Sequence, residues 1–452
     1  MAVDPDVVEE LLARDAQIAA TNTKADANLV ATQDNATQTA ALVSQLVALD
    51  ARVTVLEGTP PAEPPVEPPA FDTVFVPGDL LDLQSAGNTV LVRTGSYLGQ
   101  VLAPRPGQHV TFDDGCVLDG GARWNPGPES SNTVDVLNPG PSSVIIGSAP
   151  NVTIIGNGLV VTGYLPSKQN GGFEFAGDDF YGQDFTVQEC AAVGMMLLGD
   201  RAHCVRVSAN RNEQMGWKYL SNVDGFMEDC YAFENNINRA YSKGWEAGGS
   251  KFVRTVRLRI VGGESSRNVG AGWWTDIDNR DTVYKDTECH DNEKAGIAHE
   301  ISGPMLVDGG RFTGNAFTRG WLQASQITVF NSGTHSSSSL GHNGCEIRNA
   351  VTNGAGGVNG IEQDRQTSPG NIVAKNLKGL WVHDCDMTFA EGSNGVGSPD
   401  SAGLDPFSAA WNNRYESNTY RTAQSQPFHW DNASRTWAQW QAAGNDLNGE
   451  VV

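Results

Sequence analysis

Two acidic residues occupy the same place in neighbouring repeats of this sequence. The segment Gly272-Trp-Trp-Thr-Asp-Ile277 aligns with Gly296-Ile-Ala-His-Glu-Ile301, which puts Asp276 beside Glu300. If both segments are strands with the isoleucines pointing inward, the two carboxylates point outward from strands about 4.8 Å apart. Like charges this close raise the pKa of one carboxyl, which is the asymmetry that acid–base catalysis needs. The spacing suits a retaining glycosidase, whose two carboxyls lie about 5–5.5 Å apart.

Five further residues are candidates for substrate binding around this pair. Trp274 is expected to stack on a sugar ring, and Lys218 and Glu246 are expected to project from the same face on earlier repeats. Asp278 and His299 lie close by in the sequence. Strand alternation turns His299 inward, which is more typical of a hydrogen-bonded core histidine than of a base.

Three interpretations of this acidic ladder stay open. The pair could catalyse glycan cleavage, the face could bind glycan without cleaving it, or the carboxylates could be structural. In the structural case they are solvated or hold Ca²⁺ through oxygen ligands. No cofactor is predicted, and Ca²⁺ is the one metal considered.

The elements that must position these residues are short strands in a long repeat. Pairs of glycine and a bulky residue recur at spacings of 22, 28, 28, 24 and 24 residues. A period in the twenties without a helical pattern is typical of a solenoid built from short strands. The pairs are Gly194-Met195, Gly216-Trp217, Gly244-Trp245, Gly272-Trp273, Gly296-Ile297 and Gly320-Trp321.

An acid–cysteine pair is a second marker of the repeat. It occurs as Glu189-Cys190, Asp229-Cys230, Glu288-Cys289 and Asp384-Cys385, and we expect these pairs to occupy equivalent interior positions. The chain has seven cysteines, and an odd number with this placement predicts buried thiols rather than a disulfide framework.

The repeats from residue 272 to 302, together with His290-Asp-Asn-Glu293, resemble a run common in bacterial right-handed parallel β-helix proteins. This is the pectin-lyase-like family, the architecture of pectin lyases and many phage tail spikes. The resemblance covers roughly residues 71 to 446. It implies an all-β right-handed parallel β-helix over 71–452, closed by a Trp-rich C-terminal cap. One such solenoid hosts many chemistries, so the resemblance specifies the fold and not the function.

The N-terminal region has a different pattern. A heptad runs unbroken from Val7 to Leu56, which predicts a coiled-coil stalk over 1–58. Asn28 and Asn35 fall on core d positions, as in the trimeric adhesin and phage-fibre stalks that this stretch resembles, and we expect a parallel homotrimer. Residues 59–70 form a Pro-rich linker, which is stiff and extended.

Net charge and the absence of a leader limit the function further. The formal charge of −23 disfavours nucleic acid and anionic membranes as partners, and no apolar run predicts membrane insertion. No signal peptide is visible, which favours a protein made in the host cytoplasm and carried in a virion. We therefore expect a phage tail fibre or tail spike that binds a host surface glycan, cleaves it or not, and joins other tail proteins through its stalk. The alternatives are a secreted bacterial polysaccharide-active enzyme, a glycoside hydrolase or lyase, and a purely structural virion component.

Overall fold

The computed structural model describes residues 71–244, 246–317, 325–335, 338–354, 359–364, 378–389, 395–398, 405–431 and 433–452. The chain divides into two units, Met1–Pro69 and Ala70–Val452. The coiled coil expected over 1–58 and the linker expected over 59–70 lie outside the described residues and remain predictions.

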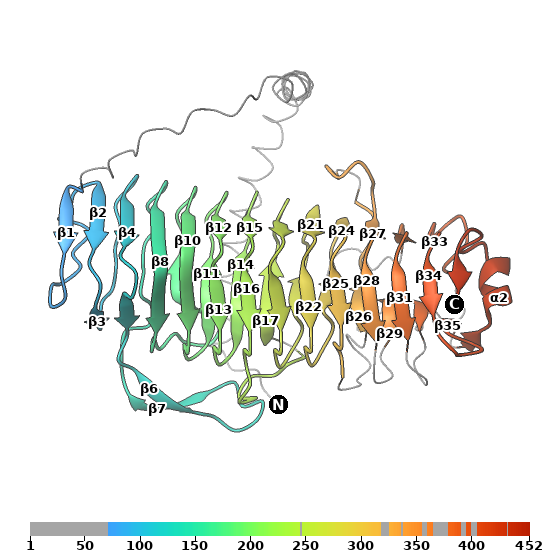
Figure 1. The fold of residues 1–452 in the computed structure, drawn as a ribbon, viewed down its shortest axis with the longest axis horizontal. Helices are drawn as coiled ribbons and strands as arrows, with labels where there is room; N and C mark the ends of the chain where they lie inside the picture. Colours follow the sequence, from blue (N-terminus) through green and yellow to red (C-terminus); the bar gives the residue numbers. More distant parts are fainter. Residues whose placement is uncertain are drawn as a thin grey trace, which may run out of the picture. The chain divides into compact units, whose positions relative to one another are not determined.

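The described chain winds into a parallel β-helix whose strands form three ladders (Figure 1). The first ladder contains β1 Thr73–Phe75, β2 Thr89–Val92, β4 His109–Phe112, β8 Thr153–Thr162, β10 Tyr181–Gln188, β12 His203–Val205, β15 Phe226–Glu228, β18 Arg259–Val261, β21 Thr282–Lys285, β24 Met305–Asp308, β27 Cys345–Arg348, β30 Trp381–His383 and β33 Arg414–Glu416. Long strands β8 and β10 also pair in the second ladder, so the first two ladders form one 24-stranded sheet.

The second ladder follows the first after a short turn in most coils. Its other strands are β3 Ser96–Leu98, β5 Val117–Asp119, β13 Ser208–Asn210, β16 Tyr231–Phe233, β19 Glu264–Ser266, β22 Glu288–His290, β25 Arg311–Thr313, β28 Val351–Gly354, β31 Asp386–Phe389, β34 Thr419–Arg421 and β37 Glu450–Val451. The third ladder is an 11-stranded sheet. It comprises β9 Gly171–Phe175, β11 Val193–Leu197, β14 Met215–Leu220, β17 Gly248–Val253, β20 Trp273–Asp276, β23 Ile297–Glu300, β26 Ser325–Phe330, β29 Asn359–Asp364, β32 Val396–Ser398, β35 Phe428–Trp430 and β36 Ala433–Arg435.

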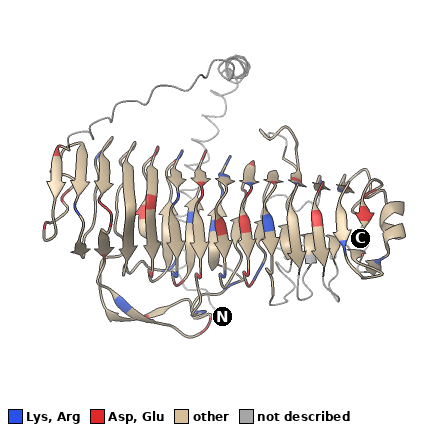
Figure 2. Ribbon diagram, in the orientation of Figure 1, with Lys and Arg blue, Asp and Glu red and all other residues tan. Residues whose placement is uncertain are grey.

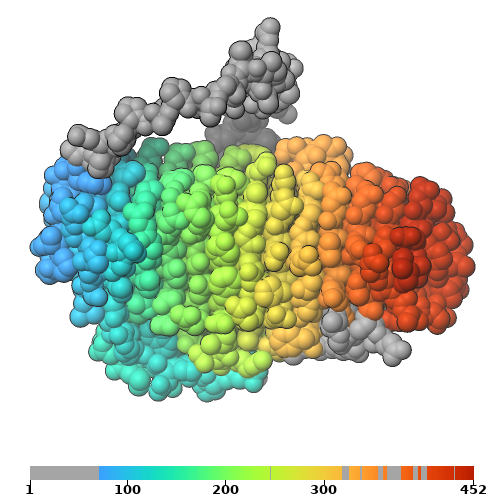
Figure 3. Space-filling model, viewed as in Figure 1, coloured from blue at the N-terminus to red at the C-terminus, as the bar shows by residue number. Residues whose placement is uncertain are grey.

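These ladders confirm the predicted parallel β-helix. Every strand pair within them is parallel except β35 with β36 at the C-terminal end. Successive coils stack in sequence order, so colour runs in bands along the β-helix (Figure 3). The inward side chains form one apolar core, in which Trp217, Trp273 and Ile297 are fully buried.

Asparagines line the corner between the second and third ladders. From Asn235 onward, each amide oxygen accepts from the backbone N–H and the side-chain amide of the asparagine on the preceding coil, as Asn235 Oδ1 does from Asn212 at 3.0 and 3.1 Å. The row consists of Asn212, Asn235, Asn268, Asn292 and Asn315, and it ends on Gln326. Turn asparagines of the sequence therefore satisfy buried backbone groups that the solenoid cannot pair otherwise.

Four glycines of the Gly-plus-bulky pairs lie against this asparagine row, namely Gly194, Gly216, Gly272 and Gly296. The predicted pair Gly320-Trp321 lies outside the described residues. A Cβ on Gly272 would stand 2.5 Å from the carbonyl oxygen of Gly296 and 2.9 Å from Asn292 Nδ2. The repeat thus needs glycine because coil backbones and corner amides meet there. The glycine that belongs to this row on the next coil is Gly249, and not Gly244 as the predicted pairs had it. The register shows this, because Trp217 pairs with Ser250, the residue after Gly249. Trp245 itself lies outside the described residues.

The acid–cysteine pairs share burial but not position. All seven cysteines are free and buried, which confirms the prediction of buried thiols. The expectation of equivalent positions is wrong. Cys190 lies at the asparagine corner, where its N–H donates to Asn212, whereas Cys289 is inside strand β22. Cys230 and Cys385 occupy turns between the first and second ladders. Small size and apolarity suit all of these places.

A hairpin leaves the β-helix early and packs on later coils. Its strands are β6 Arg123–Pro126 and β7 Val134–Asn138 (Figure 1). The hairpin tip is held by backbone bonds from Ser130 to Arg239 O at 2.9 Å and from Asn132 to Ala240 O at 2.8 Å. The hairpin therefore docks on the connection between β16 and β17, which contains Arg239 and Ala240.

The C-terminal end carries the one α-helix among the described residues, α2 Trp437–Ala442. Trp440 is fully buried and stacks on Phe428 with ring centres 4.6 Å apart. Its indole donates to Asp446 Oδ2 at 2.8 Å, which also accepts from Tyr420 at 2.6 Å. The Trp-rich tail thus packs on the last coils, with the Trp440 indole hydrogen-bonded inside it.

Candidate functional site

The candidate site lies on the outer face of the third ladder, at strands β17, β20 and β23. Asp276 pairs in register with Glu300. Their neighbours Thr275 and His299 point inward and are fully buried. Trp274 and Ala298 belong to an apolar cluster separate from the main core, as residues on the opposite face of the sheet must. The two carboxylates therefore lie on the outer face, side by side on successive coils.

Lys251 contacts the first carboxylate. Its Nζ lies 2.9 Å from Asp276 Oδ2, and both side chains are about nine-tenths buried, at 11% and 8% exposed. The same Nζ lies 4.1 Å from the centre of the Trp274 ring. Lys251 therefore makes a short charge-assisted contact with Asp276 and a cation–π contact with Trp274.

Asp276 has a second oxygen in a different environment. Among the described residues no donor reaches Oδ1, although the atom is buried. Buried acceptors without a partner are uncommon in folded proteins and call for a functional or structural reason. Oδ1 is therefore a buried acceptor whose lone pairs no hydrogen bond of the described residues engages.

Glu300 has a neutral hydrogen-bond donor instead of an ammonium contact. Its Oε2 accepts from the indole Nε1 of Trp274 at 3.2 Å. Burial, and then the neighbouring charge of Asp276, raise the pKa of Glu300 to about 7, while Lys251 and the indole N–H act in the opposite sense. The raised pKa of Glu300 agrees with the sequence pattern, which predicted such a rise for one carboxyl of the pair.

The backbone after each carboxylate is strained. Ile277 has φ +60° and Ile301 has φ +47°, in the left-handed region that β-branched residues seldom adopt. The prediction that these isoleucines continue the strand and point inward is therefore wrong, because each strand ends at its carboxylate and the chain turns there. Strain of this kind clusters at functional sites.

Five residues were predicted to bind substrate around the carboxylate pair. One of them, Trp274, does contact the pair, but its ring is not exposed to a ligand. The side chain is 2% exposed, under Lys251 and over an alanine patch. Burial leaves no free ring face for a sugar, so Trp274 acts here as a hydrogen-bond donor to Glu300.

Lys218 is on the same outer face of the third ladder as the carboxylate pair, on β14, two coils before Trp274. It pairs in register with Lys251, and its Nζ donates to Gln169 O and Gln169 Oε1, both at 2.9 Å. It thus shares the row of Lys251 and Trp274 without contacting the carboxylate pair.

Glu246 is not on a strand, which corrects its predicted place. It precedes β17, and its carboxylate is 3.0 Å from Lys168 Nζ. The position expected for it, next to Trp274 on the preceding coil, belongs to Lys251. The cause is the long connection between β16 and β17, which moves the coil boundary from Gly244 to Gly249.

His299 and Asp278 stand apart from the outer face. Nε2 of His299 donates to Gly303 O at 2.8 Å, so Nδ1 accepts from Thr275 Oγ1 at 2.7 Å. Burial lowers the pKa of His299 to about 4, which keeps the ring neutral. The expectation that it points inward is met, and it cannot contact a ligand on the outer face. Asp278 is half-buried in the left-handed turn after Ile277.

Sequence reasoning missed Lys251 as a site residue. The signal was the dipeptide Gly248-Gly249, which marks the true start of the coil. If Gly249 is aligned with Gly272, Lys251 takes the place of Trp274 and Val253 the place of Asp276, as the register shows.

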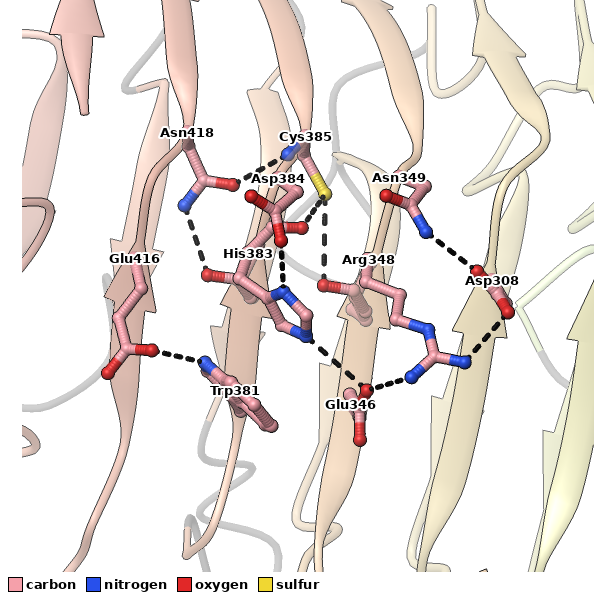
Figure 4. Close-up of polar contacts among 12 residues, drawn as sticks. Asp308, Glu346, Arg348, Asn349, Trp381, His383, Asp384, Cys385, Glu416 and Asn418 are labelled. Carbon is pink, nitrogen blue, oxygen red and sulfur yellow. Dashed lines mark hydrogen bonds and ion pairs between the residues drawn. The ribbon is translucent and has the colours of Figure 1, made fainter. Parts of the chain in front are cut away.

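A second polar network lies on the first ladder (Figure 4). Glu346 Oε1 is 2.8 Å from Arg348 Nη1 and 3.3 Å from His383 Nε2. Arg348 also reaches Asp308 at 2.8 Å, and His383 Nδ1 lies 2.6 Å from Asp384. These groups satisfy one another across β24, β27 and β30, so this network joins coils and offers no unpaired group as a ligand site.

Other classes of site find no support among the described residues. No group of three or more His, Cys, Asp or Glu side chains there is placed to hold a metal ion, so the Ca²⁺ hypothesis gains no ligand set. In the same part of the chain, no helix combines the length and apolar composition needed to cross a membrane. Figure 2 shows acidic and basic residues interspersed along the β-helix.

No family model matches the sequence, and no curated protein matches it. Similar solved structures include the A-module of mannuronan C-5 epimerase AlgE4 from Azotobacter vinelandii, with 12% identity and a TM-score of 0.39 over 69% of this chain and 91% of that chain. The catalytic unit of a GH87 α-1,3-glucanase from Streptomyces thermodiastaticus has 11% identity and a TM-score of 0.42, over 75% and 58%. A polygalacturonase from Erwinia carotovora has 12% identity and a TM-score of 0.38, over 74% and 97%. Likeness at this level carries no argument about function.

Proposed function

We propose that this chain is the receptor-recognition part of a phage tail fibre or tail spike, which binds a host surface polysaccharide on the outer face of the third ladder and cleaves it with Asp276 and Glu300. The observation that carries the proposal is the pair itself: two carboxyls in register, one beside an ammonium ion and the other beside an indole N–H. One carboxyl protonates the leaving oxygen, and the other attacks the anomeric carbon or activates water.

Burial and strain distinguish this pair from other acidic neighbours. Glu264 and Glu288 are also in register, on β19 and β22, but Glu288 is exposed and Glu264 binds His290 at 2.8 Å. Asp276 and Glu300 are 6% and 9% exposed, and each is followed by a left-handed isoleucine. A carboxyl pair that is both desolvated and strained has the features of a functional site.

The phage assignment rests on the heptad pattern before the β-helix. A predicted trimeric stalk joined to a solenoid with an outward carboxyl pair suits a fibre that presents three copies of a glycan site. The secreted-enzyme alternative uses the same site, and the genes next to the coding sequence discriminate between the two. Tail-assembly genes support the proposal, and a secretion leader upstream of the coding sequence contradicts it.

The enzymatic part is tested on a panel of purified bacterial capsular and O-antigen polysaccharides, with release of reducing ends as the measurement. We expect the parent protein to cleave at least one of them. Asp276→Asn and Glu300→Gln should each lower the rate by about 10³-fold or more while leaving binding near the parent's. Glu300→Gln should also melt near the parent at pH 5, where the raised pKa keeps Glu300 protonated. Glu288→Gln, which changes the other in-register pair, is the matched control and should cleave normally. Parent-like cleavage by both site variants contradicts the assignment.

A further inference from the structure

Lys251 contacts both Asp276 and the Trp274 ring, and a carboxyl pair does not by itself require such a lysine. It projects from β17, the coil before Asp276, and lies in the row of Trp274. Glu300 is one coil beyond Asp276, about 4.8 Å further along the axis. A cation on this side of the pair therefore acts unequally on the two carboxyls, and its direct contact is with Asp276 Oδ2 at 2.9 Å.

We propose that Lys251 is a positioning residue that assigns the roles of the pair: Asp276 is the ionised nucleophile, and Glu300 is the general acid. The inference rests on the proposed glycan cleavage and deepens it, because it fixes which carboxyl does what and in which pH range the site works.

The contacts of each carboxyl support this assignment. An ammonium ion at 2.9 Å stabilises the carboxylate of Asp276. Glu300 has the neutral indole donor at 3.2 Å and the negative charge of Asp276 beside it. Two close carboxyls in a dry site hold one proton between them over a range of pH. The proton goes to the member without the direct ammonium contact, which is Glu300.

The geometry also identifies the attacking atom. Lys251 occupies Oδ2 of Asp276, whereas Oδ1 has no hydrogen-bond partner among the described residues. Oδ1 is enclosed by its neighbours, but no hydrogen bond of the described residues engages its lone pairs, so it is the oxygen of Asp276 that we assign to the anomeric carbon. The second contact of Lys251, with the Trp274 ring at 4.1 Å, fixes the indole that donates to Glu300. One side chain thus orients both members of the pair.

The reaction balances with these groups and water. Glu300 transfers its proton to the glycosidic oxygen as the bond from that oxygen to the anomeric carbon breaks, and the leaving oxygen keeps the bonding electrons. Oδ1 of Asp276 forms an ester bond to the same carbon. Water then attacks that carbon, gives a proton to the Glu300 carboxylate, and the ester bond breaks to restore ionised Asp276. The product retains its anomeric configuration, because two displacements occur at one carbon.

The test compares Lys251→Met and Lys251→Arg on the polysaccharide that the parent cleaves, over pH 4.5 to 9. Lys251 lowers the pKa of Glu300, so Lys251→Met should raise that pKa and move the basic limb of the kcat profile, where the general acid loses its proton, to higher pH. We expect at least a tenfold loss of kcat at pH 5, because the nucleophile has lost its ammonium partner, and a smaller loss on the displaced basic limb, with KM changed less than threefold. Lys251→Arg keeps the charge and should stay near the parent profile.

Lys285→Met removes an exposed lysine from β21 and is the matched control, which should leave the profile unchanged. Lys251→Gln replaces Lys251→Met if the latter does not fold. The positioning role is overturned if the neutral variant loses the same fraction of kcat at every pH, or if only its KM changes. If the parent cleaves nothing on the panel, the proposed function fails and this inference with it. Parent cleavage with an unmoved profile refutes the inference alone.

Discussion

Trp274 donates its indole N–H to Glu300 Oε2 across 3.2 Å, from strand β20 to strand β23. A neutral donor stabilises the ionised carboxyl, but burial and the charge of Asp276 outweigh it, and the pKa of Glu300 stays at about 7. The charge of this buried group therefore changes near neutral pH, and both stability and chemistry must respond there.

The first prediction concerns the pH dependence of stability. A carboxyl whose pKa is raised on folding contributes stability that is complete below its unfolded value, about 4.5, and is lost as pH rises through the folded value, about 7. Glu300→Gln mimics the protonated form at every pH. Relative to this variant, the free energy of unfolding of the parent should fall by on the order of 3 kcal/mol between pH 4.5 and 8.5. Denaturant unfolding at fixed protein concentration measures the difference, and parallel pH curves for the two proteins refute it.

The second prediction removes the indole donor. Trp274→Phe keeps an aromatic ring beside Lys251 but lacks the N–H that favours ionised Glu300. The pKa of Glu300 should then rise further, so the loss of stability with increasing pH moves to higher pH. In the double variant Trp274→Phe with Glu300→Gln, no such pH-dependent loss should remain. An unchanged titration in the single variant means that the hydrogen bond does not hold the carboxyl.

The sequence predicted the fold well because its glycines and corner asparagines are forced by contacts between coils. It predicted the pairing of Asp276 with Glu300 for the same reason, since each follows its glycine by four residues. It could not locate Lys251, because the connection from β16 to β17 lengthens that coil to the 33 residues separating Asn235 from Asn268. Strand alternation also could not show that Trp274 packs against Ala271, Ala295 and Ala298. That packing depends on which residues the neighbouring coil presents.

The third prediction tests the glycine row. In Gly272→Ala the new methyl group would stand 2.5 Å from Gly296 O, so the two coils that contain β20 and β23 must move apart. We expect a loss of stability of about 2 kcal/mol or more, or failure to fold. Gly244→Ala is the matched control, because nothing lies within 4 Å of its Cβ position and Gly244 has left the row. Melting temperatures of the two variants decide the matter, and equal values contradict the close approach.

The fourth prediction concerns assembly. The heptad from Val7 to Leu56 predicts a parallel trimer, and this region lies outside the described residues. Light scattering on the full chain should give three times its mass of 48.2 kDa. Replacing Leu46 and Leu49 together with glutamate should weaken the trimer by placing charge in the predicted seam. A monomer or dimer of the parent at micromolar concentration rules the trimer out.

The fifth prediction separates strain from packing at the site. Ile277, at φ +60°, follows Asp276 directly, and its side chain is half-buried. Left-handed backbone costs ordinary L-residues about 1–2 kcal/mol, and asparagine tolerates it better. Ile277→Asn should therefore keep or raise the free energy of unfolding, by up to about 1 kcal/mol. Ile297→Asn makes the same replacement at a fully buried strand position and should lose about 3 kcal/mol or more. If the strained turn positions Asp276, Ile277→Asn should also cleave more slowly while remaining as stable as the parent. Equal destabilisation by both variants means that the isoleucine turn is held by packing and stores no strain.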